Sequence, residues 1–214
     1  MTLSSKRSVT VCAGVSSSGK TTFGLRLAVN GPFALRAFYD AEFSERDPLK
    51  PEYSDRLRIP EATSGGDLDT AVCRGWIAFN PHVMFPGRLE EGLEFFCDWM
   101  MEVSKRIPGE KLLVVDEIWR YCNPHSLPPY LAAVVQGGRR ARLQLLCNTQ
   151  EPSSLGKIAN GMSELVAFHL QSKANLEWTE HFGLNPAEIQ TLPALAYVAK
   201  NCDTGGELRG KIKI

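Results

Sequence analysis

The sequence predicts an α/β fold, with a mainly parallel central sheet flanked by helices and a C-terminal β-hairpin. One observation is that short apolar, β-branched runs alternate with amphipathic stretches along the 214 residues. A second is a glycine-rich loop between the first apolar run and the first helical stretch. A third is the acidic pair Asp116 and Glu117, which directly follows an apolar run. Ligands of open parallel sheets bind at the carboxyl ends of strands, where the loop and the acids both fall.

The elements are expected in a regular order. Strands are predicted at 8–13, 34–39, 76–79, 111–116, 143–148, 164–170, 194–200 and 207–214. Helices are predicted at 22–28, 66–74, 89–107 and 176–182, with another beginning near Ser126. The apolar stripe of 89–107 favours packing on the sheet, with a partner-binding stripe as the alternative. Residues 41–61 contain three prolines and mixed charges, which predicts a surface excursion, and Asn185-Pro186 predicts a turn.

Composition limits the class of protein. With 43% hydrophobic and 22% charged residues, the chain is typical of a globular protein, and we expect one domain over residues 1–214. The 24 basic and 24 acidic residues exclude a general nucleic-acid-binding coat but leave a local basic patch open. The six cysteines form no C-x-x-C pair, which favours small core residues in a reducing compartment. No run reaches the length of a membrane span, so we expect an intracellular protein without an integral membrane segment.

The loop Gly14-Val15-Ser16-Ser17-Ser18-Gly19-Lys20-Thr21 matches the phosphate-binding pattern G-x-x-x-x-G-K-[ST] at every fixed position. In such a loop, backbone N–H groups and the positive end of the helix hold phosphate oxygens. We expect this loop, together with Thr22, to bind ATP. Lys20 would reach the β- and γ-phosphates, and Thr21 would bind Mg²⁺. The alternative is a Gly/Ser-rich turn that matches by chance.

The acidic pair is the expected second half of this site. Asp116 would hold Mg²⁺ through water, and Glu117 would take a proton from, or orient, the water that attacks the γ-phosphate. A Glu beside the metal-binding Asp favours attack by water, whereas a transferase activates the hydroxyl of its substrate. Solvated acids at a strand end are the alternative. Gln150 ends the next strand and is interpreted as a sensor of the γ-phosphate, with a simple turn residue as the alternative.

Three arginines precede that strand: Arg139, Arg140 and Arg142. Guanidinium groups suit two tasks, which are stabilising phosphoryl transfer in a neighbouring subunit and binding nucleic-acid phosphates. Arg140 and Arg142 are the candidates for nucleic-acid contacts. A solvated basic loop is the alternative.

Taken in order, these features resemble the FtsK–HerA superfamily of DNA-pumping ATPases. They are the phosphate loop, the Asp116-Glu117 strand, an Arg eleven positions before Gln150, and Thr149-Gln150-x-Pro152. More narrowly, the chain resembles the genome-packaging ATPases of tailless, often membrane-containing icosahedral viruses and phages. The likeness extends from about Val9 to Lys200 and implies a P-loop NTPase fold of the ASCE/RecA-like type.

The resemblance also implies residue roles. Arg139 falls on the family's arginine that acts across a subunit interface, although the choice between Arg139 and Arg140 stays open. Gln150 falls on the family's sensor, and Asp40 resembles the acid that closes the second strand. Arg142 stands where relatives usually have Gly. Glu151 stands where Arg is usual, which puts a nucleotide-gated role of that position in doubt.

The function implied by the resemblance is a Mg²⁺-dependent ATPase that translocates double-stranded DNA and packages a viral genome into a preformed capsid. A homo-oligomeric ring, a hexamer, and contacts with capsid or vertex proteins are implied, in the host cytoplasm or at the virion vertex. One alternative is a nucleoside or nucleotide kinase, although the chain lacks a C-x-x-C zinc ribbon and an Arg-rich lid. A nucleotide-gated phage assembly factor is the other.

Overall fold

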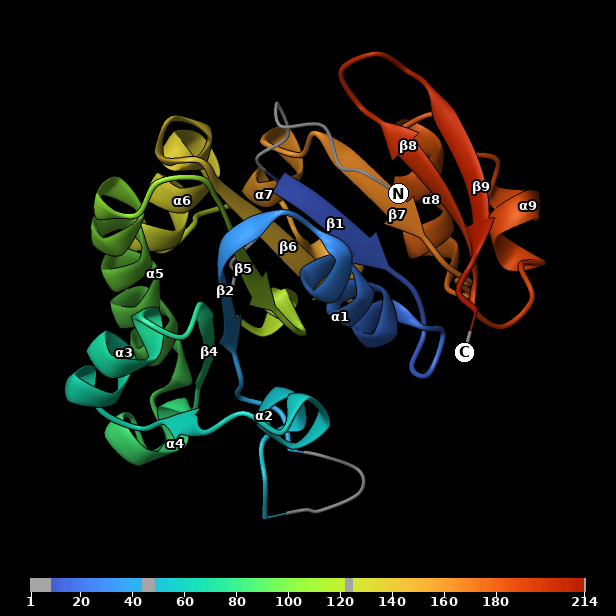
Figure 1. Cartoon of the computed structure of the whole chain (residues 1–214). Helices are drawn as coiled ribbons and strands as arrows, with labels where there is room; N and C mark the ends of the chain where they lie inside the picture. The colour runs from blue at the N-terminus through green and yellow to red at the C-terminus, as the bar shows by residue number, and fades with distance from the viewer. Residues whose placement is uncertain (1–8, 44–48, 122–124, 214) are drawn as a thin grey trace. The chain divides into compact units, whose positions relative to one another are not determined.

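The computed structural model describes residues 9–43, 49–121 and 125–213. They fall into two compact units, which are described in turn (Figure 1). Unit 1 comprises residues 1–31, 117–127 and 146–214, and unit 2 comprises residues 32–116 and 128–145. The predicted α/β fold with a mostly parallel sheet and a C-terminal hairpin is confirmed. The extent of the domain, residues 1–214, stays a prediction.

Unit 1 contains the glycine-rich loop and the C-terminal third of the chain. Its strands are β1 (Val9–Ala13), the end of β6 (Leu143–Thr149), β7 (Glu164–Ala167), β8 (Ala196–Asn201) and β9 (Glu207–Lys211). Its helices are α1 (Lys20–Asn30), α7 (Lys157–Asn160), α8 (Lys173–His181) and α9 (Pro186–Gln190), with 3₁₀ turns η1 (Ile118–Tyr121) and η2 (Pro152–Ser154). Strand β1 pairs in parallel with β7, in the register Thr10 to Glu164, whereas β7, β8 and β9 are antiparallel. Three aromatic rings, those of Phe23, Phe168 and Tyr197, pack together beneath α1.

Unit 2 contains parallel strands in the order β3-β4-β2-β5. These strands are β2 (Phe33–Tyr39), β3 (Glu61–Ala62), β4 (Trp76–Phe79) and β5 (Glu110–Val115), and the first residues of β6 also belong to the unit. The helices are α2 (Glu52–Leu57), α3 (Gly65–Val72), α4 (Pro81–Met84), α5 (Leu89–Arg106) and α6 (Pro129–Ala141). The parallel strands bring the carboxyl ends of β2 and β5, and so Asp40 and Asp116, to one edge.

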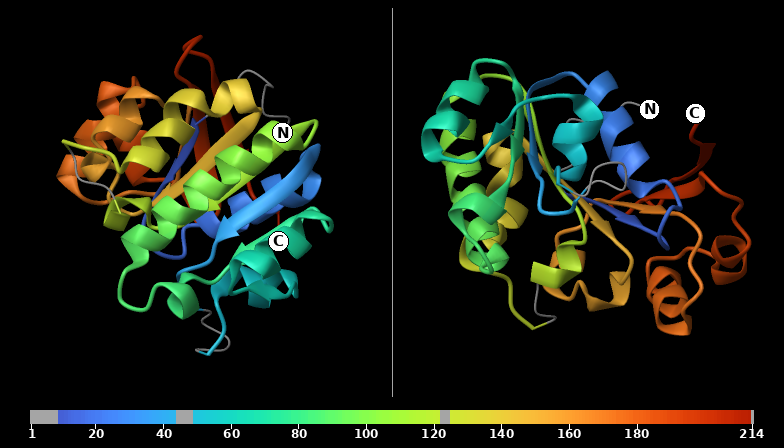
Figure 2. Two further views of the ribbon diagram at one scale, coloured as in Figure 1. Left: turned by 90° about the vertical axis from the view of Figure 1, so that its left-hand side faces the viewer. Right: turned by 90° about the horizontal axis from the view of Figure 1, so that it is seen from below.

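The predicted stripe of α5 packs on the strands of unit 2. Leu93, Phe96 and Met100 are fully buried, and the Phe96 ring stacks on Phe79 of β4 at 4.9 Å between centroids. Helices α5 and α6 lie side by side (Figure 2). The Glu94 carboxylate of α5 accepts hydrogen bonds from two backbone N–H groups in the first turn of α6, at 2.9 and 3.0 Å. This carboxylate therefore caps a helix whose own N-terminal residues are prolines.

Some sequence predictions were wrong in detail. The excursion at 41–61 contains a helix, α2, whose Tyr53 is buried and donates its backbone N–H to Asp40. The turn predicted at Asn185-Pro186 is the start of α9, since the Asn185 side chain caps two N–H groups. Strand β7 ends at residue 167, and α6 begins at residue 129 rather than near Ser126. Part of the excursion (44–48) and Cys122 lie outside the described residues.

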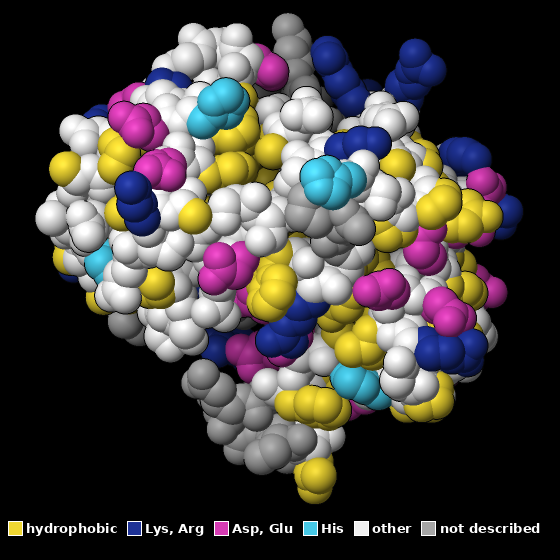
Figure 3. Space-filling model, turned by 180° about the vertical axis from the view of Figure 1, so that it is seen from behind, with side chains coloured by type: hydrophobic (Ala, Val, Ile, Leu, Met, Phe, Trp, Pro, Cys, Tyr) yellow, Lys and Arg dark blue, Asp and Glu magenta, His cyan; other side chains and the backbone are white. Residues whose placement is uncertain are grey.

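The surface has a mixed character. On the face drawn in Figure 3, basic, acidic and apolar side chains alternate without a field of one sign. Within the described ranges, no helix combines the length and hydrophobicity that crossing a membrane requires. Cys12 and Cys147 are buried in the core, as predicted.

Candidate nucleotide-binding site

The glycine-rich loop joins the end of β1 to the start of α1 in unit 1. Its first residues are held by the ends of two strands, because the Gly14 N–H donates to Thr149 O at 3.1 Å and the Val15 N–H to His169 O at 2.9 Å. Ser17 and Gly19 have positive φ angles of 57° and 115°. These left-handed residues reverse the chain so that α1 begins at Lys20, and the loop lies at the positive end of that helix.

Lys20 is directed back into its own loop. Its side chain is buried, and the ammonium donates to the carbonyl oxygens of Gly14 at 2.8 Å and Val15 at 3.0 Å. These carbonyl acceptors are neutral, whereas phosphate oxygens carry negative charge and would attract the ammonium more strongly. The lysine is therefore poised to exchange loop carbonyls for the phosphates of a nucleotide.

Two features of the loop fit a triphosphate. The first is Gly14, where an added Cβ would lie 2.5 Å from Ser18 Oγ and 2.7 Å from Phe168 Cβ, so only glycine allows this close packing. The second is the buried Ser18 hydroxyl, which has no hydrogen-bond partner among the described residues. An orphaned buried hydroxyl is costly, and a phosphate oxygen would satisfy it. The structure places the other loop residues as follows: Ser16 and Ser17 are exposed, whereas Val15, Gly19, Thr21 and Thr22 are half-buried.

Glu117 and Gln150 are in direct contact within unit 1. The Gln150 side-chain amide donates to Glu117 Oε1 at 2.8 Å, and its backbone N–H donates to Oε2 at 3.3 Å. Glu117 has a φ of 45°, an uncommon conformation for a residue with a side chain, which turns the chain sharply at this point. The predicted hydrolytic acid and the predicted sensor are thus brought together by β6 and the turn after residue 116. Their chemical roles stay predictions.

Sequence reasoning missed two residues that hold this pair. Trp119 Nε1 donates to Glu117 Oε2 at 2.6 Å. Asn175, at the start of α8, donates to Gln150 O at 3.1 Å and to the Glu151 carboxylate at 3.2 Å. Spacing alone contains no signal for Asn175, because it is 25 residues from Gln150. The Glu151 carboxylate therefore has a local partner in this structure.

Asp40 and Asp116, which follow β2 and β5, both belong to unit 2. Asp40 is buried, and its two carboxylate oxygens accept the N–H groups of Tyr53 at 2.8 Å and Ser54 at 2.7 Å, which anchors α2 to the end of β2. Burial raises the pKa of Asp40 to about 7, opposed by these hydrogen bonds and assisted by the charge of Asp116. The Tyr53 hydroxyl hydrogen-bonds Asp116. The pKa of Tyr53 is raised well above its usual value, chiefly by burial and then by the charge of this carboxylate.

The predicted metal ligands supply hard oxygen donors. Thr21 offers a hydroxyl in α1, and Asp116 offers a carboxylate after β5. Over the described part of the chain, no group of three His, Cys, Asp or Glu side chains forms a metal cluster. Mg²⁺ keeps several waters and commonly takes one or two protein oxygens with phosphate oxygens, so each of these groups is a suitable ligand type for Mg²⁺ bound with a nucleotide.

The three arginines lie at the end of α6 and are exposed. Arg139 and Arg140 occupy the last helical turn, and Arg142 is the residue just after it. Arg142 has a φ of 54°, a left-handed conformation that glycine adopts without strain.

Comparisons with known proteins agree with this geometry. No protein-family model matches the chain, and neither does any curated protein. Among solved structures, the genome packaging NTPase B204 from Sulfolobus turreted icosahedral virus 2 in complex with ATP-gammaS is similar, with a TM-score of 0.77 and 18% identity over 99% of this chain and 100% of that chain. The chain shares the P-loop NTPase fold of this packaging NTPase.

Two further structures support the same fold. B204, the DNA-packaging ATPase from Sulfolobus turreted icosahedral virus, is 16% identical, with a TM-score of 0.68, over 97% of this chain and 98% of that chain. VirB4 of Thermoanaerobacter pseudethanolicus is 11% identical, with a TM-score of 0.63, over 97% of this chain and 89% of that chain. The predicted fold class and the predicted resemblance are therefore confirmed.

Proposed function

We propose that the protein is a Mg²⁺-dependent ATPase that translocates double-stranded DNA to package a viral genome. The observation that carries the proposal is the glycine-rich loop at the positive end of α1, in which Lys20 is buried and the buried Ser18 hydroxyl finds no partner among the described residues. Support comes from the fold shared with a viral packaging NTPase that was solved with ATP-gammaS. A nucleotide bound with Mg²⁺ would supply the phosphoanhydride bond and the metal's charge stabilisation.

The residues of this chain would divide the work. The loop N–H groups and Lys20 would hold the phosphates, and Thr21 and Asp116 would hold the metal. Glu117 would accept a proton from the attacking water, with its carboxylate held by hydrogen bonds from Gln150 and Trp119. The contact between Glu117 and Gln150 offers a route by which γ-phosphate occupancy at the sensor would alter the base.

Partners and location belong to the same proposal. A homo-oligomeric ring, a hexamer, would let Arg139 or Arg140 reach the nucleotide of the next subunit, since both side chains are exposed at the end of α6. Capsid or vertex proteins would be its docking partners, in the host cytoplasm or at the virion vertex.

The test is ATP turnover by the purified protein, with and without double-stranded DNA. Phosphate release that rises with DNA supports the proposal, whereas phosphorylation of an added nucleoside or nucleotide would instead identify a kinase. Lys20→Ala should abolish turnover, because it removes the positive charge at the β- and γ-phosphates. Arg26→Ala is the matched control, since it removes an exposed cation from the same helix. Undiminished hydrolysis by Lys20→Ala would refute the assignment of the loop.

A further inference from the structure

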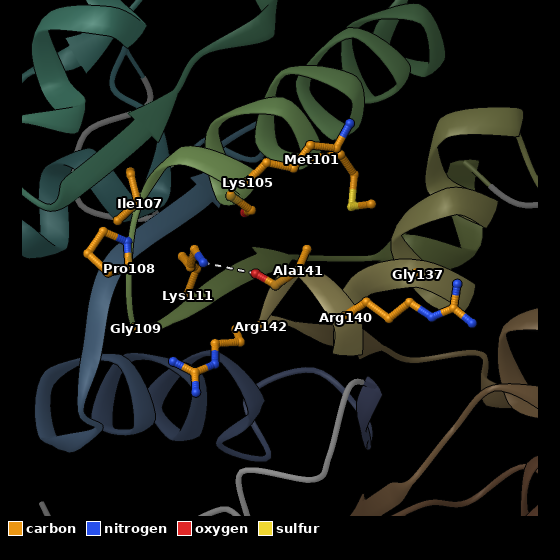
Figure 4. Close-up of a pocket in the computed structure, with 11 residues that line it drawn as sticks. Met101, Lys105, Ile107, Pro108, Gly109, Lys111, Gly137, Arg140, Ala141 and Arg142 are labelled. Atoms are coloured by element: carbon orange, nitrogen blue, oxygen red, sulfur yellow. Dashed lines mark hydrogen bonds between the residues drawn. The ribbon is translucent and has the colours of Figure 1, made fainter.

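A groove of about 550 Å³ opens in unit 2, where α5 and α6 end and β5 begins (Figure 4). Lys111 lies at the start of β5, and Asp116 directly follows the end of that strand. Because a parallel strand rises about 3.3 Å per residue, the backbones of these two residues are roughly 16 Å apart. The groove is therefore separate from the strand end at which Asp116 is expected to bind a metal.

The groove is cationic. None of the described residues that line it is acidic, and four are basic: Lys105, Lys111, Arg140 and Arg142. Arg106 and Arg139 lie in the same two helical ends. Two carboxylates offset part of this charge, since Glu102 pairs with the lysine of α5 and Glu110 lies 3.9 Å from the Arg142 guanidinium. The first pair is exposed and the second joins an exposed guanidinium to a half-buried carboxylate at the limit of ion-pair distance, so their stabilisation is weak and the local excess of positive charge persists.

Two buried polar groups in the groove have unused hydrogen-bonding capacity. The Ser104 hydroxyl lines the groove, is buried, and finds no hydrogen-bond partner in the described part of the chain. The Lys111 side chain is 2% exposed, and its ammonium donates to Ala141 O at 2.8 Å, as Figure 4 shows. A lysine ammonium has three donors, so this hydrogen bond to the end of α6 leaves capacity for another acceptor. Burial lowers the pKa of Lys111, and a bound anion would oppose that shift.

The groove also permits close approach of a ligand. Gly109 and Gly137 form part of its wall, and a Cβ added to Gly137 would touch only Met101 Cε, at 3.4 Å. Ile107 and Pro108 add an apolar side. A hydroxyl donor, a buried ammonium and two guanidinium groups around a small-residue wall match the oxygens of a phosphate group.

We propose that this groove binds phosphates of a nucleic-acid backbone, with Ser104 and Lys111 as its buried donors and Lys105, Arg140 and Arg142 as its outer cations. The polymer is favoured over a single free phosphate because the last turns of the two helices hold four basic side chains and Arg142 and Lys111 lie beside them, more charge than one phosphate neutralises. The assignment rests on the proposed function for the identity of the polymer. It extends the predicted contacts of Arg140 and Arg142 to a built site with an interior.

The experiment measures binding of the full chain to a fluorescein-labelled DNA duplex by fluorescence anisotropy, across a salt series and without nucleotide. The variants are Lys111→Met, Ser104→Ala, and the exposed pair Lys105→Gln with Arg140→Gln. Each lost phosphate contact should reduce the slope of log K against log salt by about 0.9, so the exposed pair should reduce it by about 1.8. Arg74→Gln is the matched control, because it removes an exposed cation of unit 2 outside the groove.

The outcomes separate the possible ligands. Loss of affinity and slope in the groove variants, with Arg74→Gln unchanged, supports the assignment. Parental affinity and slope in the exposed pair overturn it, even if Lys111→Met does not fold. A third outcome is that inorganic phosphate stabilises the parent but not Ser104→Ala, while the variants bind the duplex as the parent does. This result identifies a free-phosphate site and also overturns the assignment. So does groove-dependent binding of polyglutamate in place of DNA. Because no nucleotide is present, failure of the ATPase proposal would appear separately, in the turnover assay.

Discussion

Asp40 is expected to make the free energy of unfolding fall as the pH rises through neutrality. Its pKa is raised from 3.8 to about 7 in the folded protein, chiefly by burial. Between these two values the folded state binds more protons than the unfolded state, so stability decreases with pH. The contribution is fully present below about pH 4 and is lost as the pH rises through about 7.

The magnitude follows from the size of the shift. A difference of about 3 pKa units corresponds to about 4 kcal/mol, with a slope of about 1.4 kcal/mol per pH unit inside the window. Four surface acids have lowered pKa values, so they change the free energy of unfolding only below about pH 4.5: Asp67, Glu102, Glu188 and Glu207. The window of Asp40 is therefore separable from theirs.

The perturbation is Asp40→Asn, which keeps the size and an acceptor oxygen for the N–H of Tyr53 or Ser54 but removes the titration. Urea unfolding, followed by tryptophan fluorescence at a series of pH values, measures the free energy. The difference in free energy of unfolding between parent and variant should change by up to about 4 kcal/mol between about pH 4 and 7, with the variant relatively more stable at the higher pH. Asp55→Asn, at a partly exposed position of α2, is the control. Parallel profiles for parent and Asp40→Asn would show that burial does not hold a proton on this carboxyl.

Three further predictions concern the nucleotide site. Gly14→Ala should weaken ATP binding in calorimetry while far-UV circular dichroism stays native, because the new Cβ would lie 2.5 Å from Ser18 Oγ; parental affinity would contradict the close packing of the loop. Glu117→Gln should still bind ATP but hydrolyse it roughly 10²–10⁴-fold more slowly, because the amide is no base; loss of binding would instead make Glu117 structural or a metal ligand. Arg139→Ala subunits mixed with Lys20→Ala subunits should recover part of the turnover if the arginine acts across a subunit boundary; full activity of Arg139→Ala rings alone would exclude that role.

Much of the fold and the core of the site could be predicted from local patterns. The glycine-rich loop is recognisable because its function depends on backbone geometry that only particular residues allow, such as Gly14 beneath Ser18 and the left-handed Gly19. The buried stripe of α5 and the apolar run of β5 are likewise visible, since burial imposes a period on the sequence. Motif spacing also placed Glu117 and Gln150 at strand ends, where they meet.

Contacts between residues distant in sequence were decided only by the tertiary structure. Asn175 binds Gln150 from α8, and Asp40 anchors a helix inside a segment that its prolines marked as irregular. Ser104 and Lys111 line the same groove where α5 ends and β5 begins. No local motif predicts these contacts. Whether a buried polar group finds a hydrogen-bond partner depends on which chain segment packs against it. A sequence specifies which polar groups are buried through its periodicity, but the partners of those groups exist only once the chain has folded.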